Sequence, residues 1–226
     1  NVKKVLQGTE TYTLHKPKIK KFPTRKFLAD GIDHIWQIDL IDIQKLSGSN
    51  YSNKYIFVAI DIFSKKAFTE PMKTKQAKSS LEAFKSIISK SERKPKVVYM
   101  DKGNEFKAEF KKYLSEQSPP ILLVTTNSRL HKAALVERFN RTIKEKMWRY
   151  FTLNKYKAKN NLEFNNYVQV LDKLVDNYNN TIHSSIKRSP NSVNKSNEAQ
   201  VREVLYGYKN PDTFDEDNYI KFKEKH

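Results

Sequence analysis

Three carboxylates occupy positions where an ordinary surface charge is not expected. Asp39 lies inside an apolar segment, Asp101 ends another, and Glu137 stands in the first turn of an expected helix. Burial of an anion is unfavourable unless a cation or a catalytic role compensates for lost hydration. A cluster of oxygen ligands suits a hard ion such as Mg²⁺, and two such ions about 3.5–4 Å apart support in-line phosphoryl transfer. We therefore expect Asp39, Asp101 and Glu137 to be catalytic metal ligands acting on a phosphodiester.

Each of these carboxylates also has an ordinary structural interpretation. Asp at a strand end often forms a turn, and Glu in a first helical turn interacts favourably with the helix dipole. Two other acidic residues compete with them. Asp42 lies an odd number of residues from Asp39, which places it on the opposite face of a strand. Asp61 is expected to be a structural residue at a strand end, or else a group that supports the three carboxylates.

The apolar pattern predicts the elements that must position these residues. Residues 35–43 and 55–63 read as buried strands paired in a hairpin, and 67–72 as a third strand. Helices over 75–90 and 106–114 alternate with strands over 97–100 and 121–124. The order β-β-β-α-β-α-β-α indicates an α/β fold with a mixed five-stranded sheet flanked by helices. If the first and fourth strands are neighbours, Asp39 and Asp101 come side by side.

A polar stretch over 125–132 reads as a loop, and a helix follows it. The apolar stripe of that helix consists of Val136, Phe139, Ile143, Met147 and Tyr150. This helix can place Glu137 over the two aspartates. A further helix is expected over 162–180. We divide the chain into a basic extended linker (1–30), an α/β core (31–155), a helical extension (156–200) and a tail or the start of another module (201–226).

The charge of the chain points to nucleic acid as its partner. The formal net charge is +18, and six cations without a carboxylate fall between Lys16 and Lys26. A lysine-rich genome is the alternative explanation. With no cysteine and only five scattered histidines, neither a disulfide nor a zinc site is expected. No apolar run approaches the roughly 20 residues that cross a membrane, and the sequence reads as a piece of a longer protein.

The spacing of the carboxylates resembles that of retroviral-type integrases. The 35 residues between Asp101 and Glu137 match the D,D(35)E pattern, and the residues around all three carboxylates are similar to that superfamily. Further similarity, at Lys16-Pro17, Asp61-Ile62-Phe63-Ser64-Lys65 and Tyr178-Asn179-Asn180-Thr181-Ile182-His183, is to integrases of Maverick/Polinton transposons and virophages. The resemblance covers about residues 15–205.

The resemblance implies an RNase H-like fold, with residues 31–155 as the integrase catalytic core. It also implies two Mg²⁺ or Mn²⁺ ions per site, 3′-end processing of element DNA, and transfer of the exposed 3′-hydroxyls to target DNA. A homo-oligomer on double-stranded DNA, in the host nucleus or the virus particle, is expected by the same resemblance. This sequence departs from the family pattern because it has no cysteine for the usual His/Cys zinc module, and we expect no complete C-terminal module after residue 205.

The resemblance also implies DNA contacts around the carboxylates. Arg141 and Lys144 lie four and seven positions after Glu137, on the same helix face, and would grip the element's own DNA end. An ion pair on a solvated face is the alternative. Lys132 and His131 would meet phosphate from the preceding loop, unless they are ordinary surface residues. Asn104 corresponds to a position that contacts target DNA, or else caps a helix.

Three functions remain open from the sequence. The first is an integrase that processes and joins DNA ends. The second is a cut-and-paste DDE transposase or nuclease that uses the same triad to give a different product. The third is a catalytically retired DNA-binding scaffold, against which the intact triad argues. The two tryptophans, Trp36 and Trp148, are expected to pack in the core and along the helix rather than to stack on bases.

Overall fold

The computed structural model describes residues 26–101, 108–126, 133–155, 165–208 and 219–220. Their centre is a five-stranded sheet with the strand order β4-β3-β2-β5-β6. The strands are β2 (Ile35–Asp42), β3 (Tyr55–Asp61), β4 (Ala67–Met72), β5 (Val97–Asp101) and β6 (Leu122–Thr126). Strands β2, β3 and β4 form an antiparallel meander, whereas β5 and β6 run parallel to β2. The predicted mixed sheet is confirmed.

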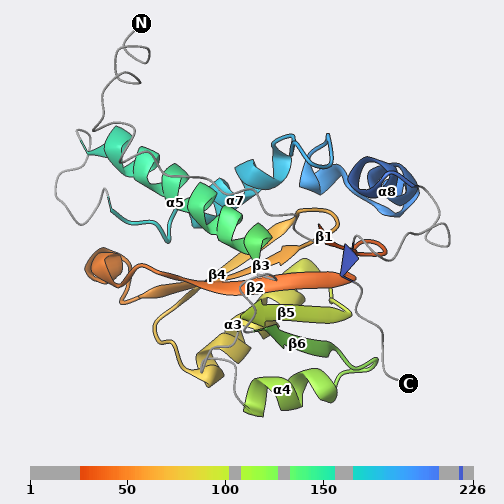
Figure 1. The fold of residues 1–226 in the computed structure, drawn as a ribbon. Helices are drawn as coiled ribbons and strands as arrows, with labels where there is room; N and C mark the ends of the chain where they lie inside the picture. The colour runs from red at the N-terminus through yellow and green to blue at the C-terminus, as the bar shows by residue number, and fades with distance from the viewer. Residues whose placement is uncertain (1–25, 102–107, 127–132, 156–164, 209–218, 221–226) are drawn as a thin grey trace, which may run out of the picture.

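Helices cover both faces of the sheet (Figure 1). On one side lie α3 (Ala77–Ser91) and α4 (Ala108–Ser115). On the other lie α5 (Ala134–Asn154), α7 (Leu171–Asn180) and α8 (Glu198–Tyr206). The described residues also form three 3₁₀ helices: η1 (Gln44–Ser49), η2 (Pro190–Ser192) and η3 (Lys195–Asn197). None of the described helices combines the length and apolar character that a membrane span requires.

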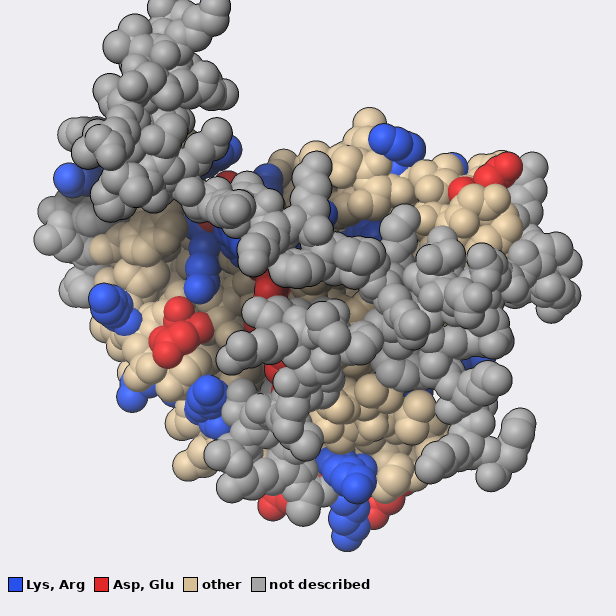
Figure 2. Space-filling model, in the orientation of Figure 1, with Lys and Arg blue, Asp and Glu red and all other residues tan. Residues whose placement is uncertain are grey.

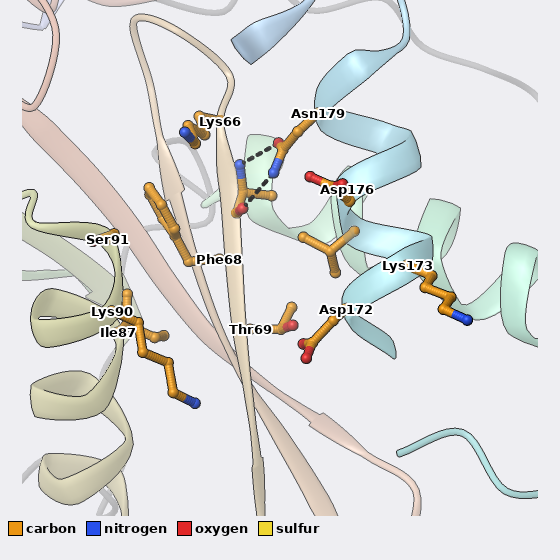
Figure 3. A pocket seen from close by; sticks show the side chains of 12 residues that line it. Lys66, Phe68, Thr69, Ile87, Lys90, Ser91, Asp172, Lys173, Asp176 and Asn179 are labelled. Atoms are coloured by element: carbon orange, nitrogen blue, oxygen red, sulfur yellow. Dashed lines mark hydrogen bonds between the residues drawn. The ribbon is translucent and has the colours of Figure 1, made fainter. Parts of the chain in front are cut away.

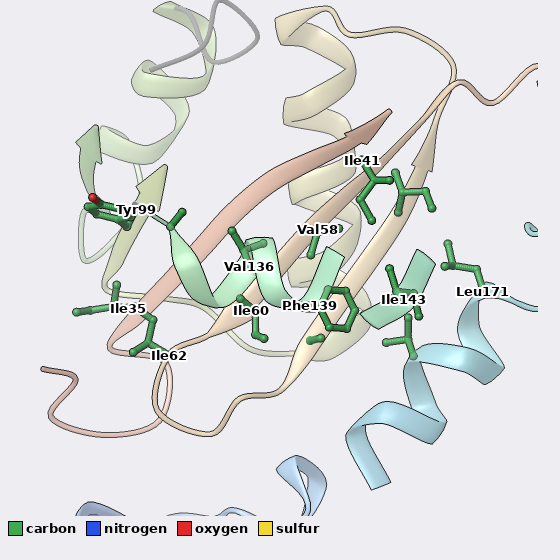
Figure 4. Close-up of a cluster of buried hydrophobic side chains, with 14 of the residues drawn as sticks. Ile35, Ile41, Val58, Ile60, Ile62, Tyr99, Val136, Phe139, Ile143 and Leu171 are labelled. Atoms are coloured by element: carbon green, nitrogen blue, oxygen red, sulfur yellow. The ribbon is translucent and has the colours of Figure 1, made fainter. Parts of the chain in front are cut away.

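The central strand β2 is buried on both faces because each face supplies a separate core. Trp36 and Ile38 pack with Phe84 and Phe110 on the side of α3 and α4. Ile35 and Ile41 point the other way, into the cluster beneath α5 that Figure 4 shows. Alternate residues of a strand point to opposite faces, so an unbroken apolar run is what a strand between two helical layers requires.

Helix α5 packs through residues spaced at three and four positions. Its buried side chains are Val136, Phe139, Ile143, Met147 and Phe151. The predicted stripe ended at Tyr150, which is only half-buried, and the residue that completes the stripe is Phe151. The face opposite this stripe is left exposed for polar residues.

The packed region extends beyond residues 31–200. Lys26–Phe27 form strand β1, paired in parallel with β7 (Tyr219–Ile220), and Leu28 and Ala29 are buried. Helix α8 crosses residue 200 and buries Val201. Such pairing between distant segments leaves no periodic signal in the sequence.

The helix predicted over 162–180 is present only as α7 within the described residues. The Asn50 side chain explains the later start, because its Oδ1 accepts hydrogen bonds from the N–H groups of Tyr167 (2.7 Å) and Val168 (3.2 Å). These bonds hold residues 167–168 in a turn.

Helix α7 also closes part of the edge of β4. The Asn179 side chain accepts a hydrogen bond from the Ala67 N–H and donates one to the Ala67 carbonyl, both at 2.9 Å (Figure 3). Below this contact a groove of about 500 Å³ lies between β4, α3 and α7. Strand β3 separates this groove from β2 and Asp39.

Candidate active site

Asp39 lies in the last half of β2, on the face covered by α5. Its carboxylate accepts two hydrogen bonds: Oδ1 from the N–H of Leu40 at 2.8 Å, and Oδ2 from Nδ2 of Asn140 at 2.7 Å. The side chain is half-buried. Asp39 is therefore fixed both by its own strand and by the helix above it.

Asp101 reaches Asp39 through the pairing of β2 with β5. The last paired positions are Gln37 and Tyr99, and two further residues along each parallel strand lead to Asp39 and Asp101. Side chains two residues apart lie on the same face of a strand. Asp101 ends β5 with an exposed side chain. The predicted adjacency of the first and fourth strands is confirmed.

Glu137 is carried by the first turn of α5, and Gln37 anchors that turn to the sheet. Oε1 of Gln37 accepts hydrogen bonds from the N–H groups of Leu135 and Val136, each at 3.2 Å. The first N–H groups of a helix have no partner within the helix, so this buried amide takes the place of an N-cap. Because Gln37 and Asp39 share a face of β2, the same bonds place Glu137 over Asp39.

The electrostatics of Asp39 link the three carboxylates. Burial raises the pKa of the Asp39 carboxyl, and the negative charges of Asp101 and Glu137 raise that pKa further. The hydrogen bonds from Leu40 and Asn140 act in the opposite direction. The structure thus brings Asp101 and Glu137 within electrostatic reach of Asp39, although they stand far apart in the sequence.

A divalent cation suits this donor set. The three carboxylates offer only oxygen, the ligand that hard cations prefer, and a cation between them would offset the mutual repulsion that raises the Asp39 pKa. Oδ1 of Asn140 is buried without a hydrogen-bond partner among the described residues. Within those same residues no three acidic or histidine side chains already form a metal-binding group. Cation binding would therefore have to draw the side chains of Asp101 and Glu137 towards Asp39.

The cations predicted on α5 lie on its exposed side. Arg141 and Lys144 are both exposed and follow Glu137 by one and two helical turns. Figure 2 shows Lys and Arg side chains close to acidic side chains on this face of the molecule. Three other predicted contacts, Asn104, His131 and Lys132, lie outside the described residues.

The two rival carboxylates have other surroundings. Asp61 is fully buried and accepts hydrogen bonds from the Ser64 hydroxyl (2.5 Å) and the Arg93 guanidinium (2.9 Å), which gives it a structural role. Asp42 is exposed at the end of β2. Its carboxylate accepts hydrogen bonds from the backbone N–H (3.1 Å) and the side chain (2.8 Å) of Gln44.

Two polar residues of the site, Gln37 and Asn140, were not predicted. Each stood at a spacing that could have identified it. Gln37 precedes Asp39 by two residues on one strand, and Asn140 follows Glu137 by three residues on one helix. The prediction for the tryptophans was right for Trp36, which is fully buried, but Trp148 is 56% exposed.

Comparison with known proteins gives the same fold. Residues 30–118 match the integrase core domain family. A transposon-derived protein of Caenorhabditis elegans is 30% identical over 142 residues, which are 62% of this chain and 46% of that protein. The Gag-Pol polyprotein of koala retrovirus is 30% identical over 123 residues, 54% of this chain and 7% of the polyprotein. The chain therefore spans less than half the length of either relative.

Solved structures of viral integrases superpose on most of the chain. An intasome of simian T-cell lymphotropic virus, in complex with PP2A regulatory subunit B56 gamma, has a TM-score of 0.60 at 18% identity and covers 83% of this chain and 63% of its own. The HTLV-2 integrase catalytic core domain in complex with magnesium (trimeric form) has a TM-score of 0.54 at 22% identity. The match covers 74% of this chain and 97% of the HTLV-2 chain. Residues 30–118 match the integrase core domain family, and the chain has the RNase H-like fold of these solved structures.

Proposed function

We propose that this chain is a polynucleotidyl transferase that processes the 3′ ends of element DNA and joins them to target DNA. The observation that carries the proposal is geometric: the pairing of β2 with β5 brings Asp39 beside Asp101, and the Gln37 bonds hold the first turn of α5, with Glu137, above the sheet. Burial raises the pKa of Asp39 and the charges of Asp101 and Glu137 raise it further, and a bound cation would offset this effect. The match to the integrase core domain family over residues 30–118 supports this reading.

Asp39, Asp101 and Glu137 would hold two Mg²⁺ or Mn²⁺ ions. The structural relative from HTLV-2 was solved in complex with magnesium, which supports the choice of metal. When bound, such ions activate the attacking hydroxyl and stabilise the leaving oxygen of a phosphodiester exchange. Asn140 keeps the Asp39 carboxylate turned towards the site. Gln37 keeps Glu137 above it by holding the start of α5.

Double-stranded DNA is the proposed partner, from both element ends and target. Arg141 and Lys144 would contact the element end next to the carboxylates, and His131, Lys132 and Asn104 would add phosphate and target contacts. The net charge of +18 favours such an anionic partner. We further propose that the protein acts as a homo-oligomer on DNA, since joining two ends together requires two active sites, and that it does so in the host nucleus or virus particle. In this scheme residues 31–155 are the catalytic core, between a basic linker and a helical extension.

The element that this chain serves is proposed to be of the Maverick/Polinton or virophage type, on the motifs at Asp61–Lys65 and Tyr178–His183. The similarity to a transposon-derived protein of Caenorhabditis elegans favours a second candidate, a cut-and-paste transposase with the same carboxylates. The products distinguish the two functions. An integrase joins processed 3′ ends of supplied DNA to a plasmid, whereas a cut-and-paste transposase also excises an element from flanking DNA.

The decisive experiment combines labelled duplex ends, a plasmid and Mg²⁺ with the full chain, followed by sequencing of joined products. A branched substrate that reports the reverse reaction is included, because that reaction has simpler requirements. We expect Asp101→Asn to abolish both reactions while DNA binding persists. Glu116→Gln, which changes an exposed carboxylate on the far face, serves as the matched control. Equal activity of Asp101→Asn and the parent chain would refute the assignment of the site.

A further inference from the structure

A second groove lies beside α5, about two to three helical turns along this helix from Glu137. Its volume is about 610 Å³, within the range of roughly 300–1,000 Å³ found for small-molecule sites. The end of β2 and the start of η1 form one wall, and α5 forms the other. The apolar lining consists of Ile43, Leu46, Met147 and Trp148.

Trp148 is the unusual member of this lining. Its side chain is 56% exposed, whereas Met147 beside it is 2% exposed. The indole meets the buried ring of Phe151 edge-on, with ring centroids 5.4 Å apart and an interplanar angle of 86°. Contact with a buried ring restricts the orientation of the indole, and more than half of its surface still faces outwards.

The groove continues the row of functional residues on α5. Glu137, Arg141, Lys144 and Trp148 follow one another at steps of four, three and four, so they share one helix face. Eleven residues at about 1.5 Å per residue place Trp148 roughly 16 Å along the helix from Glu137. That distance equals about five steps of a DNA strand at 3.4 Å per step.

The charges around the groove match a phosphate backbone. Lys45 and Lys144 line it and are exposed, against a single carboxylate, that of Asp42. Asp42 already accepts hydrogen bonds from Gln44, and the charge of Lys144 contributes to lowering its pKa. The rim is therefore net positive, above an apolar floor with an exposed aromatic ring.

We propose that this groove holds an unpaired base of the DNA strand that passes the carboxylates, stacked on Trp148 with the adjoining phosphates on Lys45 and Lys144. A nucleotide combines an apolar π-face with an anionic phosphate, which is the combination that the groove offers. Stacking tolerates every base, so no sequence preference follows from it. The inference rests on the proposed function, because it requires DNA at the active site.

Intrinsic fluorescence tests the proposal directly, because the chain has only two tryptophans and Trp36 is fully buried. The probes are a duplex with a single-stranded overhang and a blunt duplex of the same sequence. We expect the overhang duplex to quench the emission of Trp148 more strongly than the blunt duplex does. Trp148→Leu should weaken binding of the overhang duplex by about 5- to 150-fold, the effect of losing one stacked base, whereas Trp148→Phe should restore most of it.

Leu153→Ala is the matched control, since Leu153 is an apolar residue of the same helix, 72% exposed and outside the groove. Anisotropy of labelled DNA gives the affinity independently of fluorescence quenching. If both duplexes bind but Trp148→Leu changes neither affinity nor emission, the base-stacking proposal is wrong and the proposed function stands. If neither duplex binds the parent chain, the proposed function itself fails. A change in self-association of Trp148→Leu at unaltered DNA affinity would assign the groove to a protein contact instead and overturn the proposal.

Discussion

Nδ2 of Asn140 donates a 2.7 Å hydrogen bond to Oδ2 of Asp39 and so ties helix α5 to the centre of strand β2. This bond fixes one oxygen of the carboxylate and leaves the amide oxygen of Asn140 buried without a partner among the described residues. Under the proposed function, Asn140 would position Asp39 for a cation.

We predict that Asn140→Ala lowers the rate of DNA strand transfer by about 10- to 100-fold, as loss of a residue that orients a metal ligand typically does. The Mg²⁺ concentration for half-maximal rate should rise as well, which a purely structural role would not cause. Kinetics at a series of Mg²⁺ concentrations measures both effects. Thr142→Ala, which removes an exposed hydroxyl from the same helix, is the control. An unchanged Mg²⁺ requirement would contradict the positioning role.

Arg93 bridges Asp33 and the fully buried Asp61. Its guanidinium donates to both oxygens of Asp33 through Nε (2.9 Å each) and to Asp61 Oδ2 (2.9 Å). Arg93→Met should lower the free energy of unfolding by about 3–5 kcal/mol, because it leaves a buried carboxylate without its cation. Urea unfolding measures the loss. Adding Asp61→Asn to that variant should restore part of the stability, and a loss below about 1 kcal/mol for Arg93→Met would show that the network matters little.

His183 makes the fold sensitive to acid. Burial, with the charges of Lys65 and Arg138, lowers the pKa of His183 to about 4. In the unfolded chain this pKa is about 6.5, so between these values the unfolded state binds a proton that the folded state does not. Stability is consequently lost as the pH falls through this window. We expect the Tm of the parent chain to fall more than the Tm of His183→Gln when the pH is lowered from neutral to acidic values. A difference independent of pH would refute this assignment.

The cations on α5 should contribute to DNA affinity through phosphate contacts. Each of Arg141→Ala and Lys144→Ala should make the log–log dependence of affinity on salt shallower by about 0.9. Anisotropy titrations of labelled element ends at several salt concentrations give this slope. The charge reversal Lys144→Glu should weaken end binding further. Lys173→Ala, an exposed cation on α7, serves as the control. If neither Arg141→Ala nor Lys144→Ala changes the salt dependence of the affinity, the DNA does not contact this face of α5.

The fold was largely predictable where the signal is local. Strand β4 has the predicted bounds, and α5 was predicted from the spacing of Val136, Phe139, Ile143 and Met147. Alternation along β2 predicted that Asp42 faces away from Asp39, but Asp42 is the last residue of the strand, bonds to Gln44 beyond it and lines the groove beside α5. Trp148 follows Met147 by one residue and so points about 100° away from the apolar stripe, which is why its packing was only partly as predicted.

Contacts between distant segments could not be predicted, because their spacing in the sequence carries no periodicity. The pairing of β1 with β7 and the Arg93 network both belong to this class. The three carboxylates were predicted from their places in the expected strands and helix, and the resemblance of their spacing to the D,D(35)E pattern strengthened that prediction. Their mutual electrostatic effect required the tertiary structure, and so did the hydrogen bond between Asn140 and Asp39.

The Asn179 side chain satisfies both backbone groups of Ala67 as a neighbouring strand would. An open sheet edge invites pairing with the edge of another copy and leads to aggregation. The Asn179 amide of α7 occupies the backbone groups at the start of β4. A side-chain amide cannot continue the hydrogen-bond pattern of a strand, so α7 blocks the addition of another strand there. Under the proposed function, copies that assemble on one DNA molecule would then be less prone to join edge to edge through this strand.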